Sequence, residues 1–257
     1  RAAMLKRKGK DLRAMDLRSV DLFKTTFDSF TPWPSRKMLP EGFDPKRVLQ
    51  WGKPPGLGIR ELHERGVTGK GVHVAIIDQP LLLDHEDYKD QLVQYTAIGC
   101  EGVPPQMHGP GVASLLVGKT CGVAPEAKLH FWAEPSWKQD YKYRNKSLEQ
   151  IIDYNKGKPK DGQIRVVSVS KGFSPTEPNL DRWKELLDMA ESEGIYVIHC
   201  SAKMFGVGCP VFEDRDDPRK YRLWVRLRNR PFGEPGLLYA PVDNRTTAHY
   251  ESHDACI

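Results

Sequence analysis

The stretch that decides the fold spans residues 66–127 and contains three motifs in order. They read GVTGKGVHVAIID (residues 66–78), HGPGVASLLVG (residues 108–118) and GVAPEA (residues 122–127). Residues 72–77 are largely apolar and β-branched, a pattern typical of a strand that is buried on both faces. His108 precedes a short predicted helix over residues 110–117, in which a proline is allowed in the first turn. Asp78 at the end of the strand and His108 at the start of the helix are therefore the first candidates for chemistry.

Strands and helices continue to alternate after these motifs. Further strands are predicted at residues 128–132, 165–170 and 195–200. A capping box at residues 147–150 predicts a helix that starts at Ser147, and Asn179 is predicted to cap the next helix. This alternation indicates an α/β fold with a mostly parallel central sheet and helices on both faces. Functional residues in such sheets follow the carboxyl ends of strands, where Asp78, Ser170 and Cys200 fall.

The two ends of the chain look different from this regular middle part. Residues 1–50 are basic and then rich in proline and aromatic residues, so we interpret them as an N-terminal extension that packs on the domain in places. A Pro-Pro-Gly sequence at residues 54–56 marks the boundary, and residues 57–65 are predicted to form a short helix. Beyond Lys203 the pattern is more irregular: residues 222–230 alternate like an antiparallel edge strand, and residues 237–242 form a short strand.

Composition excludes several classes of protein. The 257 residues carry a net charge of +5, and no apolar run approaches the roughly 18 residues that span a membrane. The basic N-terminal residues are interpreted as a solvated tail, because no nucleic-acid-binding motif accompanies them. The five cysteines are odd in number and form no CxxC pair. This disfavours a zinc site and favours a cytoplasmic protein with reduced thiols, in which Cys200 is a small core residue.

Asp78 and His108 each allow a structural and a functional interpretation. Asp78 either caps the following turn or accepts a hydrogen bond from an imidazole N–H, which would fix its tautomer. His108 either is structural or acts as a general base toward a nucleophile on its other nitrogen. The helix N-terminus is expected to lower the pKa of His108 and keep the ring neutral.

The three motifs resemble those of the subtilisin-like serine proteases, the subtilase or S8-type peptidases. Residues 66–78 resemble the segment that leads to the catalytic Asp, residues 108–113 the catalytic-His helix, and residues 122–127 the segment after it. Residues 166–172 are similar to the strand that binds substrate main chain, and residues 194–198 to the strand before the oxyanion residue. The resemblance extends in order over residues 55–205.

This resemblance implies a subtilisin-like catalytic domain at residues 51–257 and peptide hydrolysis by an Asp-His-Ser triad. Asp78 would orient His108, and His108 would activate the serine. Ser170, Lys171 and Gly172 would pair with an extended protein or peptide substrate by adding a strand. Calcium often accompanies the family, but no acidic loop of this sequence indicates a site, so no cofactor is expected.

The sequence departs from the family at four places. Gln79-Pro80 follow Asp78 in place of a small hydroxyl residue and Gly, and Pro110-Gly111 follow His108-Gly109 in place of Thr-His. The oxyanion Asn is absent, which leaves Lys203 as a weak candidate donor. The nucleophile motif Gly-Thr-Ser is not found in the 257 residues, so the domain is expected to be incomplete at its C-terminus; Ser252 lacks the small neighbours that an exposed nucleophile needs.

Two functions therefore remain open, a serine endopeptidase whose serine lies beyond Ile257 and an inactive pseudoprotease that binds peptides or regulates a partner. A nucleotide-binding domain is disfavoured, because the glycines at residues 66–71 precede the strand and so cannot place a phosphate on the next helix. Neighbouring His253 and Asp254 do not predict a metal site, since adjacent side chains diverge. The decisive structural expectation is that Asp78 and His108 lie within hydrogen-bond reach.

Overall fold

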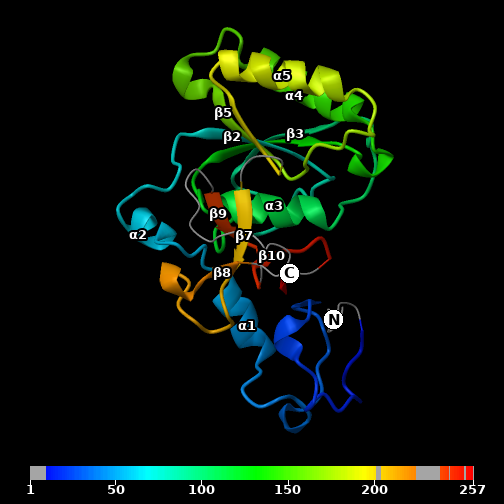
Figure 1. Cartoon of the computed structure of the whole chain (residues 1–257), viewed down its shortest axis with the longest axis vertical. Helices are drawn as coiled ribbons and strands as arrows, with labels where there is room; N and C mark the ends of the chain where they lie inside the picture. Colours follow the sequence, from blue (N-terminus) through cyan, green and yellow to red (C-terminus); the bar gives the residue numbers. More distant parts are fainter. Residues whose placement is uncertain (1–9, 201–203, 224–237, 243, 252, 257) are drawn as a thin grey trace.

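A five-stranded parallel sheet forms the centre of the protein (Figure 1). The computed structural model describes residues 10–200, 204–223, 238–242, 244–251 and 253–256. The strand order is β3-β4-β2-β5-β6, and every neighbouring pair is parallel. The strands are β2 (His73–Asp78), β3 (Leu92–Ala97), β4 (Lys128–Ala133), β5 (Ile164–Val169) and β6 (Tyr196–His199). The predicted α/β fold is thereby confirmed, although strand β3 was not predicted.

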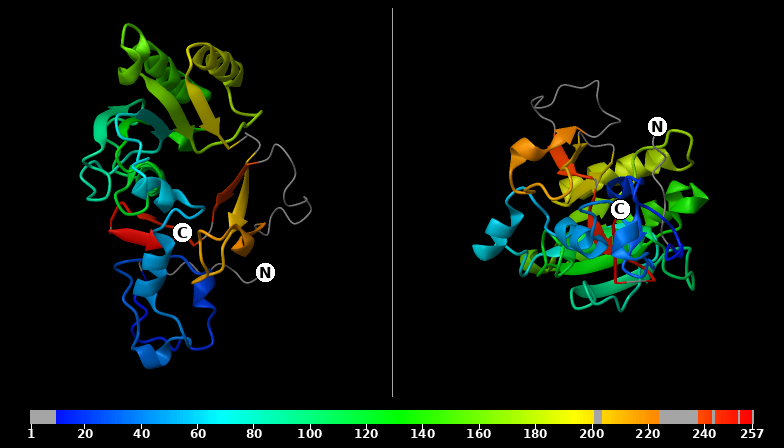
Figure 2. Two further views of the ribbon diagram at one scale, coloured as in Figure 1. Left: turned by 90° about the vertical axis from the view of Figure 1, so that its left-hand side faces the viewer. Right: turned by 90° about the horizontal axis from the view of Figure 1, so that it is seen from below.

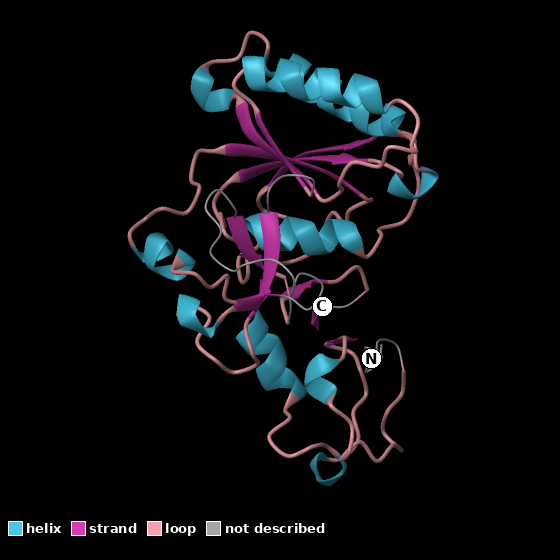
Figure 3. Cartoon of the chain, in the orientation of Figure 1, coloured by secondary structure: helices cyan, strands magenta, loops and turns pink. Residues whose placement is uncertain are grey.

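Helices cover both faces of this sheet, as predicted (Figure 3). Helices α4 (Tyr141–Asn155) and α5 (Leu180–Ser192) pack on one face, where Trp132 and Trp183 are fully buried. Helix α3 (His108–Val117) packs on the other face, against Phe131 and its neighbours. The central strand β2 is buried between the two layers, which explains its apolar sequence.

The first and third motifs pack together beside strand β2. The Thr68 carbonyl accepts the Glu126 N–H at 3.0 Å, and the Thr68 hydroxyl also bonds the Glu126 side chain. Gly69 has a φ of +80°, and a Cβ at this position would lie 2.9 Å from the Cβ of Ala124. These residues therefore have a structural role, since they join the entry of β2 to the entry of β4.

Helix α4 begins earlier than the sequence predicts. Asp140 occupies the N-cap, and its side chain accepts the Lys142 N–H at 2.9 Å. Ser147 lies in the middle of the helix, where its hydroxyl donates to the Tyr143 carbonyl at 3.0 Å, so the predicted start at Ser147 is wrong. Asn179 does precede α5, but its side chain donates to Asp140 and does not cap the helix.

The N-terminal segment forms a cluster of its own at the lower end of the protein in Figure 1. Its elements are η1 (Leu22–Lys24), β1 (Phe27–Asp28), η2 (Arg36–Met38) and α1 (Pro45–Gly52). Seven buried apolar side chains, Phe27 and Phe43 among them, pack together here. Helix α1 crosses the predicted boundary at residue 50. Strand β1 pairs antiparallel with β11 (Asp254–Cys256), which also pairs with β10 (Thr246–Ala248).

A third, small sheet lies apart from the central sheet (Figure 2). It has the order β8-β7-β9, with strands β7 (Met204–Gly208), β8 (Arg222–Leu223) and β9 (Leu238–Pro241). Strand β8 is antiparallel to β7, as the predicted edge strand requires, but residues 224–237 lie outside the described part of the chain. Strand β9 matches the predicted strand at residues 237–242, and β7 was not predicted.

The short helix α2 (Ile59–Glu64) falls within the predicted range of residues 57–65, with its apolar side chains only half-buried. Among the described residues, no helix has the length and apolarity that crossing a membrane requires.

Candidate active site

Asp78 and His108 form a close pair at the carboxyl end of strand β2. Asp78 is the last residue of β2 and His108 the first residue of α3. The His108 Nδ1 atom lies 2.7 Å from Asp78 Oδ1. The Asp78 side chain is only 5% exposed, whereas that of His108 is 42% exposed. The predicted hydrogen-bond contact is therefore confirmed, with the acid inside and the imidazole at the surface.

The contacts of Asp78 fix the tautomer of His108. An ionised carboxylate can only accept hydrogen bonds, so the Nδ1 atom of His108 must carry the proton. The Gln79 N–H donates to the same Oδ1 atom at 2.7 Å and holds the carboxylate in place. The Nε2 atom of His108 then keeps a lone pair, and no described residue bonds it.

The charge of Asp78 also changes the pKa of His108. The hydrogen bond that His108 donates to Asp78 raises the pKa of His108 above its ordinary value, and the opposing effect of burial is smaller. The expectation that the helix N-terminus lowers the pKa is therefore wrong. The carboxylate is in direct contact with the ring and stabilises the imidazolium, and this effect outweighs the burial that lowers the pKa of His108.

Gly109 lets helix α3 approach the end of β2. A Cβ at this position would lie 2.3 Å from the Gln79 carbonyl oxygen and 2.9 Å from that of Pro80. Pro110 is buried in the first helical turn, where a proline costs no hydrogen bond. The Gln79 side chain donates to the Ser136 hydroxyl at 2.9 Å. The departures at residues 79–80 and 110–111 are thus compatible with the Asp78–His108 pair.

A pocket of about 110 Å³ adjoins this pair. It brings four of the predicted site residues together, namely Asp78, His108, Ser170 and Lys171. Five further residues complete its wall: Ile77, Gln79, Glu134, Ser136 and Val169. Glu134 and Ser136 were not predicted, although Glu134 lies two residues after the strand predicted at residues 128–132 and so near the end of a strand, as Asp78 does.

A sequence profile of the subtilase family matches residues 69–203, more than half of the chain. This chain belongs to the subtilase family. The matched residues include the Asp78 strand, the His108 helix and the segment at residues 170–172. No curated protein sequence matches the chain.

Solved structures of subtilisin-like proteins share the fold. The prenylagaramide maturation protease PagA matches with a TM-score of 0.53 and 14% identity, over 78% of this chain and 73% of its own. The PatG macrocyclase in complex with peptide matches with a TM-score of 0.52 and 8% identity, over 78% and 74%. A cold adapted subtilisin-like serine proteinase matches with a TM-score of 0.50 and 13% identity, over 74% and 70%. At these identities the likeness concerns the fold alone.

The segment predicted to bind substrate already makes internal bonds in this subtilase. Lys171 donates its N–H to the Val169 carbonyl at 2.8 Å, and its own carbonyl accepts the Cys200 N–H at 3.3 Å. The Lys171 ammonium lies 2.7 Å from Glu177. The Gly172 carbonyl accepts the Tyr141 hydroxyl at 3.3 Å, and Gly172 is not part of the pocket wall. Substrate pairing at Lys171 would compete with these bonds.

The remaining residues that the sequence analysis discussed either do not line the pocket or lie outside the described part of the chain. Cys200 is exposed, because β6 ends at His199 and the chain then leaves the sheet; its assignment to the core is wrong. Lys203 and Ser252 lie outside the described residues. His253 lies 2.7 Å from Glu86. Within the described ranges, no group of three or more His, Cys, Asp or Glu side chains is arranged to hold a metal ion.

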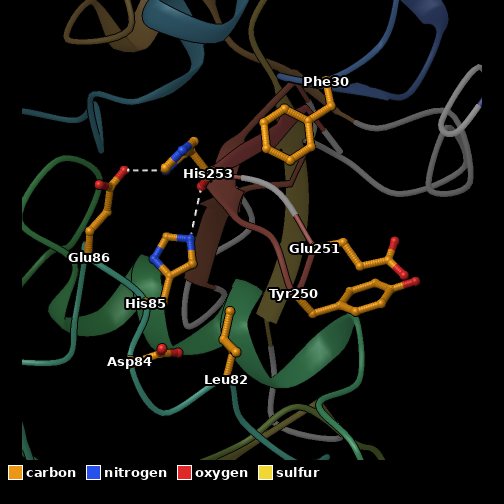
Figure 4. A pocket seen from close by; sticks show the side chains of 8 residues that line it. All are labelled: Phe30, Leu82, Asp84, His85, Glu86, Tyr250, Glu251 and His253. Atoms are coloured by element: carbon orange, nitrogen blue, oxygen red, sulfur yellow. Dashed lines mark hydrogen bonds and ion pairs between the residues drawn. The ribbon is translucent and has the colours of Figure 1, made fainter.

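A larger cavity of about 320 Å³ lies elsewhere on the surface (Figure 4). Its lining residues come from the N-terminal segment, the loop after β2 and the C-terminal part of the chain: Phe30, Leu82, Asp84, His85, Glu86, Tyr250, Glu251 and His253. His85 Nε2 contacts the His253 carbonyl at 2.9 Å, which joins the loop after β2 to the C-terminal strands. Neither Asp78 nor His108 lines this cavity.

Proposed function

We propose that this subtilase is a serine-type endopeptidase in which Asp78 orients His108 and His108 acts as the general base. The observation that carries the proposal is the 2.7 Å contact between buried Asp78 and half-exposed His108. Asp78 and His108 have different roles in this arrangement: the buried carboxylate orients the imidazole ring, and the accessible ring nitrogen exchanges protons.

The proposed reaction follows from the tautomer of His108. The Nε2 lone pair accepts the proton of a serine hydroxyl as the oxygen attacks the peptide carbonyl. The Asp78 carboxylate stabilises the imidazolium that results, and His108 then donates the proton to the leaving amine. The attacking serine is not found in the 257 residues, and Lys203 is the candidate donor to the oxyanion. The mechanism requires no cofactor.

The proposed substrate is an extended protein or peptide chain. Ser170 and Lys171 line the pocket beside His108, and with Gly172 they follow strand β5, whose pattern resembles that of a substrate-binding strand. The PatG macrocyclase, which shares the fold, has been solved in complex with a peptide. Both observations support a peptide that pairs with residues 170–172 and presents a carbonyl to the nucleophile.

Labelling of the protein from its complete gene with a fluorophosphonate probe tests the proposal. We expect one labelled serine, hydrolysis of a mixed peptide substrate, and loss of both in His108→Ala. A matched control is His63→Ala, because His63 lies on α2 away from the pocket and contacts the Val123 carbonyl. Tight peptide binding without labelling or hydrolysis would refute the peptidase and favour the pseudoprotease.

A further inference from the structure

We propose that the cavity in Figure 4 is a separate binding site of this subtilase, and that it takes an arginine side chain of a peptide. The cavity has a volume of about 320 Å³ and shares no lining residue with the pocket beside His108. The site is therefore additional to the proposed function and does not depend on it. The charge, the aromatic rings and the construction of its wall each favour this ligand.

The wall of the cavity carries carboxylates that a ligand can reach. Asp84, Glu86 and Glu251 line the cavity, and all three are exposed; the Glu86 side chain is 65% exposed. Among the residues that the structure describes, Asp84 and Glu251 have no ion-pair partner, and no lysine or arginine belongs to the wall. A cation that enters the cavity therefore meets accessible carboxylates, two of which no cation of the protein neutralises.

The two histidines of the wall do not cancel this charge. The Asp87 N–H donates to His85 Nδ1 at 3.1 Å, so this nitrogen carries no proton. His85 Nε2 lies 2.9 Å from the His253 carbonyl and must donate to it, which makes the His85 ring neutral. His253 lies 2.7 Å from Glu86 and adds at most one positive charge. Three carboxylates less at most one imidazolium leave a net charge of −2 or −3, which favours a cationic ligand and disfavours an anion.

Aromatic rings line the same cavity. Phe30 is 61% exposed, whereas Phe27 and Phe43 of the same N-terminal segment are buried. The rings of Phe30 and His253 lie edge to face with centroids 6.0 Å apart, and Tyr250 also lines the cavity. A guanidinium stacks on aromatic rings and binds a carboxylate through two parallel N–H groups, whereas the ammonium of lysine is a compact and more strongly hydrated charge. The combination of rings and carboxylates therefore favours arginine over lysine.

Contacts between distant segments hold the wall in place. The Phe30 N–H donates to Asp28 Oδ1 at 3.0 Å, and Asp28 pairs with Ala255 of β11. The contact of His85 with the His253 carbonyl joins the loop after β2 to the same C-terminal part of the chain. A wall that is already formed reduces the entropy lost on binding. The volume lies at the lower end of the range of about 300–1,000 Å³ that is typical of ligand sites.

Binding of matched dye-labelled pentapeptides tests the site without requiring hydrolysis. The central residue is arginine, its neutral analogue citrulline, or lysine, between uncharged residues, and binding is measured by fluorescence anisotropy. We expect the arginine peptide to bind at least about tenfold more tightly than the citrulline peptide, and more tightly than the lysine peptide. The preference for arginine over citrulline should weaken as the salt concentration rises from about 0.01 M to about 1 M.

Three variants locate the binding. Asp84→Asn/Glu251→Gln removes the two carboxylates that have no ion-pair partner, and should weaken binding of the arginine peptide at least about tenfold. The control Asp188→Asn/Glu191→Gln removes the same two charges from exposed positions on α5 and should leave this binding unchanged. Phe30→Ala should weaken it about two- to fivefold through loss of the aromatic ring.

Equal binding of the arginine and citrulline peptides to the wild type, or no binding of either, would overturn the assignment, and neither result requires a variant to fold. An unchanged affinity for arginine in folded Asp84→Asn/Glu251→Gln would also overturn it, as would an equal loss in the control, which would reduce the effect to net charge. Fluorophosphonate labelling is a separate measurement. Labelling without arginine binding would refute this site and leave the peptidase standing, and arginine binding without labelling or hydrolysis would do the reverse.

Discussion

Replacing Gly109 by alanine should break the Asp78–His108 hydrogen bond, although it adds a single methyl group. The new Cβ would lie 2.3 Å from the Gln79 carbonyl oxygen, and real Cβ contacts are not shorter than 3.0 Å. The start of α3 must therefore move by at least about 0.7 Å relative to the end of β2, since close-packed neighbours cannot overlap. His108 precedes Gly109, so its contact of 2.7 Å with Asp78 would lengthen to about 3.4 Å, beyond a working hydrogen bond.

This displacement has two measurable consequences. A misplacement of about 1 Å costs roughly 10²-fold in the rate of peptide hydrolysis. Overpacking costs about 1–3 kcal/mol in the free energy of unfolding, and the better helix propensity of alanine offsets up to about 1 kcal/mol of it. Titration of the His108 ring protons by NMR reports the bond directly, because the pKa of His108 should fall back toward its ordinary value.

Gly111→Ala is the matched control in the same helix. A Cβ at residue 111 would meet only the Thr247 side chain, at 3.6 Å, which is ordinary van der Waals contact. Its His108 pKa and activity should equal those of the wild type, with unchanged or slightly higher stability. If Gly109→Ala behaves like Gly111→Ala in the titration, the reasoning from close approach is wrong.

Three further predictions concern titration and buried charge. Asp78→Asn should lower peptide hydrolysis by roughly 10³–10⁴-fold. Because the hydrogen bond to a carboxylate and its charge, which together raise the pKa of His108, are gone, the acid limb of the variant's residual activity should move to lower pH, and an unmoved limb contradicts this. Burial lowers the pKa of His130 to about 4. The folded protein therefore binds fewer protons than the unfolded chain between about pH 4 and 6.5, and stability should fall by at most about 3 kcal/mol as the pH drops through this window. Urea unfolding at both ends of this pH window should show a smaller fall in the free energy of unfolding for His130→Gln than for the wild type. An equal fall in both proteins would exclude His130 as the cause. Glu134→Leu alone should cost about 3–5 kcal/mol in urea unfolding because it leaves Arg144 buried and unpaired, whereas the double variant with Arg144→Met should be nearly neutral; equal losses would show that the charge of Arg144 is not the reason.

The central sheet could be predicted from local sequence patterns, whereas the Asp78–His108 pair was predicted through the resemblance of the ordered motifs to the subtilisin-like proteases. A strand buried on both faces needs an apolar run, which β2 has at residues 74–77. Strands β4 and β5 are largely apolar but interrupted, by His130 in β4 and by Arg165 and Ser168 in β5. Strand β3 lies at the sheet edge with mostly half-buried residues, so its pattern was too weak to identify.

Features that depend on distant contacts could not be predicted. The capping box at Ser147 has the right composition, but Asp140 provides an earlier cap that the contact with Asn179 holds in place. The burial of Glu134 in the pocket wall depends on the pairing of β4 with β2, which brings it beside Asp78, and on the ion pair with Arg144 of α4. Neither relation is visible from sequence spacing.

The pairing of β1 with β11 sets an order of events during synthesis of the chain. Phe27 pairs with Cys256, 229 positions later (256 less 27). At about 5–20 residues per second, the ribosome needs roughly 10–45 s to cover this distance. Throughout that interval the N-terminal cluster has an unpaired strand edge, which is the kind of surface that associates with other chains. The central sheet can form in the meantime, whereas β1 has no strand to pair with until residues 254–256 have been synthesised.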